Sequence, residues 1–137
     1  MRLCAATSKL VDGAGVGLSL GASDEVLDSG LHSVCATDAG QDGEALQFDL
    51  GEGPSHTAHR TGSSVQAPDL ECDGMWPAFS TAATGAGLRA VFAFPLRSGS
   101  TSLGALTLYQ RVAGELTSEQ YADALIASRF ALHLLTA

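Results

Sequence analysis

Two stretches of alternating residues, joined by a short polar segment, constrain the fold of this 137-residue chain more than any other feature. Leu88–Leu96 and Ser102–Tyr109 have the composition and the period of strands. Arg97–Thr101, which lies between them, has the length and composition of a hairpin loop. The two stretches therefore predict a pair of adjacent antiparallel strands.

The first part of the chain predicts a second strand pair. A helix is expected to finish over residues 3–11, and glycines then end it. Apolar residues alternate with small or polar ones over Gly15–Leu20, which is the period of a half-buried strand. Leu31–Thr37 is expected to form the next strand, after a polar connection over Ser23–Gly30.

The remaining segments predict short helices, an edge strand and a long last helix. A break is expected over Asp38–Gly43, followed by a short helix or helical turn over Glu44–Asp49 and a short strand over Ser64–Pro68. A helix is expected over Asp73–Ala83, and a last helix from the Thr117–Gln120 capping box to about Leu135. The last helix has a broad apolar face through Tyr121, Leu125, Ile126, Phe130 and Leu134. This order predicts a single α+β domain over residues 1–137, with a mainly antiparallel sheet covered on one face by the two terminal helices.

Charge and composition exclude several classes of function. Seven basic residues against fifteen acidic ones give a net charge of -8, and Lys9 is the only lysine. Binding to a nucleic-acid duplex requires clustered cations, so direct binding is not expected. No apolar run is long enough to span a membrane, and the N-terminus makes a poor signal peptide. The chain is therefore expected to be cytoplasmic.

The three cysteines, Cys4, Cys35 and Cys72, are an odd number at wide spacing. They form neither a zinc-binding pattern nor the framework of a secreted disulfide scaffold. The simplest interpretation is that they are buried or half-buried thiols in a reducing compartment.

Asp49–Gly62, DLGEGPSHTAHRTG, is the segment that most resembles a site. The third glycine of a phosphate-binding GxGxxG is replaced by His56, and no parallel βαβ unit surrounds it. Ser55 and His59 are four residues apart and could face each other on a helix, but a GxSxG elbow is missing. His56 and His59 lack the spacing of the usual helical metal pair. A capped helix, with Pro54 in its first turn, explains the segment without catalysis or metal.

Several segments together resemble GAF domains, and in particular the actinobacterial GAF domains found ahead of an RNA-binding ANTAR domain. They are Leu50–Pro54, Arg60–Gly62, Ala67–Leu70, Trp76–Phe79, Gly87–Leu96, Leu103–Tyr109 and Leu116–Gln120, and they cover nearly the whole chain in the expected order. The resemblance implies a PAS-like α+β fold with five or six antiparallel strands. It also implies terminal helices that commonly form a homodimer, and short helices and loops that cover a ligand pocket on the other face.

The sequence departs from the functional subsets of that family. The NKFDE motif of cyclic-nucleotide binders is missing, and no cysteine is followed by the histidine typical of bilin attachment. No motif assigns haem binding to His32, His56, His59 or His133, so the cofactor stays unknown. Close relatives often carry cysteine where this chain has Ser55. No ANTAR helices follow Ala137, so the chain is expected to be either part of a longer regulator or a separate sensor.

The resemblance implies a non-catalytic sensory or regulatory domain in signal transduction or transcriptional regulation. A domain of this kind is expected to bind a small molecule or to act through protein contacts. The expected pocket residues are Ser55, His59, Trp76, Phe79 and Phe92, although both Trp76 with Phe79 and Phe92 with Phe94 also fit ordinary core packing. One alternative is an enzyme like the GAF-fold free methionine sulfoxide reductases, which Ser55 disfavours because a hydroxyl cannot replace their thiolate. The other is a dimerisation module whose pocket is filled by its own side chains.

Overall fold

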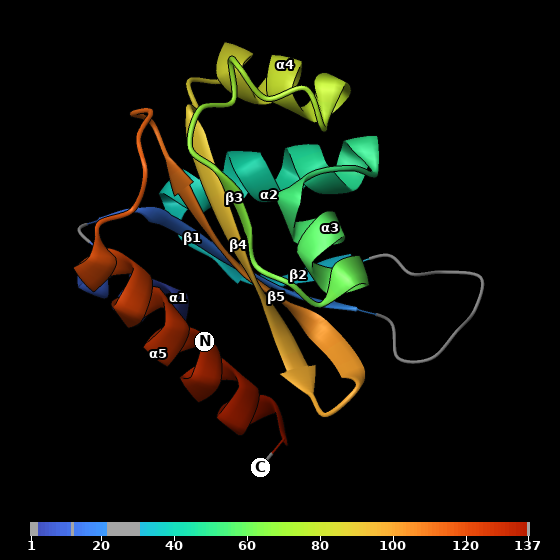
Figure 1. Cartoon of the computed structure of the whole chain (residues 1–137), viewed down its shortest axis with the longest axis vertical. Coiled ribbons are helices and arrows are strands. Elements are labelled where there is room, and N and C mark those ends of the chain that lie inside the picture. Colours follow the sequence, from blue (N-terminus) through green and yellow to red (C-terminus); the bar gives the residue numbers. More distant parts are fainter. Residues whose placement is uncertain (1–2, 12, 22–30, 137) are drawn as a thin grey trace.

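Five strands form one open antiparallel sheet in a computed structural model that describes residues 3–11, 13–21 and 31–136 (Figure 1). They are β1 (Gly15–Gly21), β2 (Leu31–Ala36), β3 (Val65–Ala67), β4 (Ala90–Ser98) and β5 (Thr101–Gln110). Their order across the sheet is β2-β1-β5-β4-β3, and every pair is antiparallel. The two strand pairs that the sequence predicts, β4 with β5 and β1 with β2, are both confirmed, and β5 lies at the centre of the sheet.

Within the described residues, five helices cover the two faces of this sheet. The terminal helices, α1 (Leu3–Leu10) and α5 (Ser118–Thr136), lie on one face, while α2 (Asp38–Leu50), α3 (Pro54–Thr61) and α4 (Pro77–Gly85) lie on the other (Figure 1). The expected α+β arrangement is therefore confirmed. The expected connection over Ser23–Gly30 lies almost wholly outside the described residues.

The alternation along β4 and β5 divides the interior into two cores. Phe92 and Phe94 of β4 join Leu106 and Leu108 of β5 in the core beneath α1 and α5. Residues of the opposite parity, including Tyr109, face α2, α3 and α4. Strand β4 contributes apolar side chains to both cores because helices cover the sheet on both sides.

Helix α2 begins at Asp38, so the expected break over Asp38–Gly43 is wrong. A Cβ atom at Gly40 would lie 2.5 Å from the carbonyl oxygen of Val16, and one at Gly43 would lie 2.2 Å from the ring of Tyr109. The two glycines thus allow the helix to pack directly on the sheet. In the sequence, both glycines look like helix breakers. The residues that they contact, Val16 of β1 and Tyr109 of β5, are not neighbours in the sequence, so the sequence does not reveal this packing.

Other boundaries follow local signals closely. Helix α3 has Gly53 as N-cap, Pro54 in its first turn and Gly62 in the left-handed region with φ 72°, as the sequence predicts. Helix α4 begins at Pro77 and not at Asp73, because proline suits the first helical position.

Of the apolar face expected on the last helix, Tyr121 packs against the core beside Phe94, but the other four residues do not. The capping box is present, with the Thr117 N–H donating to Gln120 Oε1 at 2.9 Å and the Gln120 N–H donating to Thr117 Oγ1 at 3.0 Å. However, α5 buries its small residues Ala124, Ala127, Ser128 and Ala131, whereas Leu125, Ile126, Phe130 and Leu134 are between 39% and 62% exposed. Small residues allow the helix axis to approach the sheet closely. Tyr121, Leu132 and Leu135 still pack partly against the core, whereas the other four large side chains point outward.

The cysteines also differ from the expectation of three free thiols. Cys4 of α1 and Cys35 of β2 form a disulfide, with their Cα atoms 6.4 Å apart. Cys72 is a free and exposed thiol. Wide sequence spacing concealed the pair because the fold brings the first helix to the edge strand.

Candidate functional site

Five polar side chains meet between the sheet and helices α2 and α3, where GAF domains that bind a ligand are expected to have their pocket. This buried polar cluster consists of Glu44, Gln47, Ser55, Thr107 and Tyr109, each no more than 2% exposed. Helix α2 supplies Glu44 and Gln47 from neighbouring positions on one face, the first turn of α3 supplies Ser55, and β5 supplies alternate residues Thr107 and Tyr109. Three elements that are far apart in the sequence thus fill one volume.

Gln47 is the centre of the hydrogen bonding in this cluster. Its side-chain amide donates to Ser55 Oγ at 2.8 Å and to Tyr109 Oη at 2.7 Å, and its Oε1 accepts from the Ser55 backbone N–H at 2.8 Å. The hydroxyls of Ser55 and Thr107 are 2.6 Å apart and hydrogen-bonded. Because buried polar groups are costly unless they are paired, this mutual satisfaction holds α2 and α3 to the sheet.

Glu44 is the one carboxyl of the cluster. Its Oε2 accepts a hydrogen bond from the Tyr109 hydroxyl, and its Oε1 lies 3.5 Å from Ser33 Oγ. Burial raises the pKa of Glu44 from 4.5 to about 7, although both hydrogen bonds act in the opposite direction. Burial and the adjacent carboxyl likewise raise the pKa of Tyr109. The cluster thus contains an acid that titrates near neutral pH.

The geometry of the cluster does not assemble a nucleophile with a base. Ser55 Oγ is hydrogen-bonded to Gln47 and Thr107, and neither of these residues can act as a general base. The Nε2 of His56 is 2.9 Å from the carbonyl oxygen of Gln47, and the Nδ1 of His59 is 2.8 Å from Ser102 Oγ. Ser55 and His59, which their spacing would have allowed to face each other, thus bond to different partners. Within the described residues, no group of three His, Cys, Asp or Glu side chains is arranged to hold a metal ion.

The five residues expected at a pocket occupy four different environments. Ser55 belongs to the buried polar cluster. Trp76 and Phe79 pack in the second core beside α4, and Trp76 Nε1 donates to Thr57 Oγ1 at 2.9 Å. His59 contacts Ser102, and partial burial, followed by the charge of His56, lowers its pKa. Phe92 lies in the core on the opposite face of the sheet.

Sequence reasoning missed Glu44, Gln47, Thr107 and Tyr109. One signal for Thr107 and Tyr109 was present, because they occupy the face of β5 opposite to Leu106 and Leu108. Glu44 and Gln47 were hidden because the helix that carries them was expected to be one short turn. Their convergence on Ser55 is a tertiary feature.

Two of the open features that lie outside the cluster bear on function. The first, the α3–α4 cleft, has a volume of about 210 Å³ and is lined by Gly51, Glu52, Gly53, His56, Thr57, Arg60, Met75 and Trp76. Glu52 Oε2 accepts a hydrogen bond from the Phe79 N–H at 2.9 Å, in the first turn of α4. The cleft therefore combines an aromatic side chain with groups of both charges.

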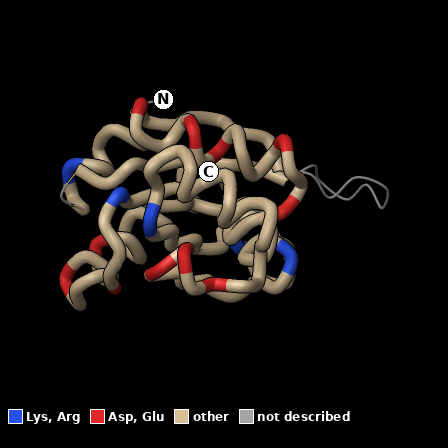
Figure 2. Tube along the Cα trace, turned by 90° about the horizontal axis from the view of Figure 1, so that it is seen from above, with Lys and Arg blue, Asp and Glu red and all other residues tan. Residues whose placement is uncertain are grey.

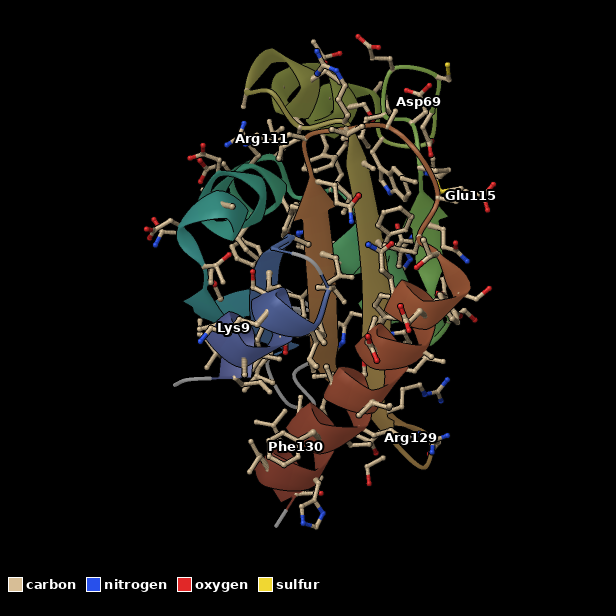
Figure 3. The ribbon with its side chains drawn as sticks, turned by 90° about the vertical axis from the view of Figure 1, so that its left-hand side faces the viewer. Lys9, Asp69, Arg111, Glu115, Arg129 and Phe130 are labelled. Atoms are coloured by element: carbon tan, nitrogen blue, oxygen red, sulfur yellow. A yellow bond between two sulfur atoms is a disulfide. The ribbon has the colours of Figure 1, made fainter. Side chains whose placement is uncertain are left out.

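The second feature, the terminal-helix groove, is apolar and has a volume of about 440 Å³. It is lined by Leu3, Ala6, Thr7 and Leu10 of α1 and by Ile126, Ala127, Phe130 and Leu134 of α5. Figure 3 shows Phe130 on the side of α5 nearer to α1, and Arg129 on the other side. The groove is thus continuous with the exposed large side chains of α5.

The charged residues do not form a basic surface. Lys and Arg lie at several separate places around the molecule, with Asp and Glu between them (Figure 2). In the part of the chain that the structure describes, no helix is long and apolar enough to cross a membrane.

Comparison with known proteins defines the fold. No protein-family model and no curated protein matches the chain. Among solved structures, it is similar to the GAF domain/HD domain protein from Geobacter sulfurreducens, with a TM-score of 0.71 and 13% identity over 98% of this chain and 88% of that one. It is also similar to the second GAF domain of DevS from Mycobacterium smegmatis, with a TM-score of 0.63 and 18% identity over 98% and 90%.

An enzyme is also among the similar structures. It is a type II free methionine-R-sulfoxide reductase from Thermoplasma acidophilum, with a TM-score of 0.66 and 14% identity over 97% of this chain and 89% of that one. The expected fold is thus confirmed, and the chain has the fold of a GAF domain. At these identities the likeness extends to the fold and not to the activity.

Proposed function

We propose that this chain is a non-catalytic regulatory domain that signals through protein contacts, as a homodimer formed by its terminal helices. The observation that carries the proposal is the orientation of α5, which buries alanines and exposes Ile126, Phe130 and Leu134. Large apolar side chains on one exposed helical face are typical of an interface. The adjoining groove extends this face onto α1.

The sequence of α5 favours a second copy of the same chain in antiparallel orientation. Glu119 and His133 are each seven residues from Ile126, and Asp123 and Arg129 are each three residues from it. At about 100° and 1.5 Å per residue, a two-fold axis beside Ile126 places Asp123 at the level of Arg129 of the second copy, on the other edge of the contact. The same axis places Glu119 opposite His133. The charge pattern is therefore self-complementary.

The same axis accounts for the apolar side chains. Phe130 of one copy would lie over Ala122 of the other, and both positions are exposed in the single chain. A large side chain facing a small one gives the interdigitation that a packed helix pair needs. This match supports a second copy as the occupant of the exposed face.

Sedimentation equilibrium of the full chain tests the proposal. The chain is expected to dimerise, and Phe130→Glu is expected to make it monomeric because it places a charge in an apolar contact. Val112→Glu is the matched control, since Val112 is 73% exposed, belongs neither to α1 nor to α5, and does not line the terminal-helix groove. A wild-type chain that stays monomeric, or a dimer unaffected by Phe130→Glu, would contradict the proposal.

The resemblance to GAF domains found ahead of ANTAR domains supports a cytoplasmic role in transcriptional regulation. With a net charge of -8 and scattered cations, we propose that the output passes through a protein and not through direct binding of nucleic acid.

A small molecule in the α3–α4 cleft is the second candidate function, favoured by Trp76 in the lining. Ser55, His59 and Phe79 lie on the same side of the sheet and would support such a site, whereas Phe92 lies on the other side. Trp76 is the only tryptophan, so its fluorescence reports on the cleft. Native mass spectrometry of protein from its own host tests this candidate. A bound molecule whose removal changes the Trp76 emission would support it, and ligand-free protein would count against it.

The methionine sulfoxide reductase alternative has a direct assay. Incubation with free methionine-R-sulfoxide and a thiol reductant is expected to give no turnover, because Ser55 supplies a hydroxyl in place of a thiolate. Turnover that is lost in Cys72→Ser would overturn the non-catalytic assignment.

A further inference from the structure

The Cys4–Cys35 disulfide joins the first helix to an edge strand of the sheet. Cys4 lies in α1 and is 3% exposed, whereas Cys35 lies in β2, next to β1 alone, and is partly exposed. The two residues are separated by 31 positions in the sequence. The bond is therefore a long-range tie between an N-terminal helix and the sheet.

Helix α1 depends on such a tie more than the other helices of its face. It has eight residues, and helices of that length are not stable alone in water. Its buried apolar contacts within the helix come from Leu3 and Cys4. Thr7 Oγ1 is buried without a hydrogen-bond partner among the described residues, so it adds no polar anchor. By contrast, α5 has 19 residues and a capping box.

Helix α1 also forms one wall of the terminal-helix groove, through Leu3, Ala6, Thr7 and Leu10. A change in how firmly α1 is held therefore changes the surface that α1 and α5 present together. Through this wall, the disulfide connects a chemical event at the sheet edge to the exposed apolar face.

We propose that Cys4 and Cys35 are a reversible redox site, oxidised by a peroxide and reduced by a dithiol, that controls the docking of α1 and thereby the terminal-helix groove. In a reducing compartment, which the proposed cytoplasmic role implies, a disulfide is usually transient and redox-sensing. The consequence for self-association rests on the proposed homodimer. The thiol chemistry and the docking of α1 are independent of whether the chain forms a dimer.

The chemistry balances in two steps. The Cys35 thiolate, on the more exposed sulfur, attacks hydrogen peroxide, forms a sulfenic acid and releases hydroxide. The Cys4 thiol then displaces the sulfenic oxygen as water, and the S–S bond forms. A dithiol reverses the change by thiol–disulfide exchange, supplying two electrons and two protons and becoming a disulfide itself.

The test uses the full chain in a Cys72→Ser background, which removes the exposed third thiol. The protein is treated with hydrogen peroxide or dithiothreitol. Alkylation of its thiols and intact mass then count the free cysteines, and amide hydrogen exchange follows each helix. We expect the disulfide to form and to be reduced in the folded protein. On reduction, exchange in α1 should accelerate about tenfold or more while β4 and β5 stay unchanged.

Cys4→Ser/Cys35→Ser is the matched variant. It should exchange like the reduced protein in both buffers, which separates the bond from any other effect of peroxide. Two thiols that stay reduced under peroxide, a bond that resists dithiothreitol until the protein unfolds, or equal exchange of α1 in both states would each overturn the inference.

Sedimentation in both redox states distinguishes this inference from the homodimer proposal. If α1 responds and the protein is monomeric throughout, the redox site stands and the dimer fails. If the protein dimerises equally in both states with no response in α1, the dimer stands and the redox site fails. A dimer that weakens on reduction, together with faster exchange in α1, supports both.

Discussion

The two faces of the sheet are covered in opposite ways. On the face of α2, α3 and α4, polar side chains point inward and satisfy one another in the buried polar cluster. On the face of α1 and α5, α5 buries mainly alanines and leaves Leu125, Ile126, Phe130 and Leu134 largely exposed. The buried polar cluster of the first face is satisfied within the single chain, whereas the second face leaves large apolar side chains exposed to solvent. Within this protein, the outer surface of the terminal helices is therefore a better candidate for function than the interior.

Truncating an aromatic side chain on each side of α5 gives the largest expected contrast. Phe92→Ala should lower the free energy of unfolding by about 3–5 kcal/mol, because Phe92 is fully buried beneath the terminal helices. Phe130→Ala should lower it by less than about 0.5 kcal/mol in dilute monomer, because Phe130 is 54% exposed. Urea denaturation measures both. Similar costs for the two variants would break the contrast between the inner and outer surfaces.

Glu44 provides a pH-dependent test of the polar face. Its folded-state pKa of about 7 lies above the unfolded value of 4.5, so its contribution to stability is fully present below pH 4.5 and is lost as the pH rises through 7. Glu44→Gln removes this loss. The variant should become more stable relative to wild type between these pH values, by about 3 kcal/mol above pH 7.

Denaturation curves at several pH values measure this difference, and Glu115→Gln is the control because Glu115 is exposed. A constant difference between Glu44→Gln and wild type over the whole range would show that Glu44 does not titrate as its burial implies.

Ser55 tests whether the cluster behaves as a unit. Ser55→Ala leaves Gln47 and Thr107 each without one hydrogen-bond partner, so the free energy of unfolding should fall by about 1–3 kcal/mol. Ser64→Ala, at an exposed serine, should have almost no effect. Chemical denaturation of the two variants side by side decides the point, and equal effects would count against a cooperative cluster.

The smallest expected effect concerns the charges of α5. Glu119→Arg should weaken dimerisation by less than about fivefold, because exposed polar pairs contribute little. Adding His133→Glu should restore it, since the pair of Glu119 with His133 is then reversed. Dissociation constants at low salt measure the effect, and a double variant weaker than either single one would exclude the proposed antiparallel pairing.

The parts of the fold that local sequence determines could be predicted. The central hairpin follows from alternation, and the start of α5 follows from Thr117 and Gln120, which hydrogen-bond to each other across one turn. Gly40 and Gly43 misled the prediction because what they contact, Val16 and Tyr109, is set by tertiary packing.

The candidate sites were harder to predict for the same reason. The cluster joins residues up to 65 positions apart, and the disulfide joins residues 31 apart. On α5, both a face of large apolar residues and a face of alanines are compatible with packing on the sheet. The alanines face the sheet because α5 lies close to it, and this distance is set by the tertiary structure.

In the proposed homodimer, the outward face of α5 packs against the same face of a second copy, around Ile126. Cross-linking of Ile126→Cys in the Cys72→Ser background tests this claim most directly, with a short bis-maleimide and with Val112→Cys as the control. We expect the Ile126→Cys chain to form covalent dimers in high yield at concentrations where the control stays monomeric. Equal yields from the two positions would contradict the claim.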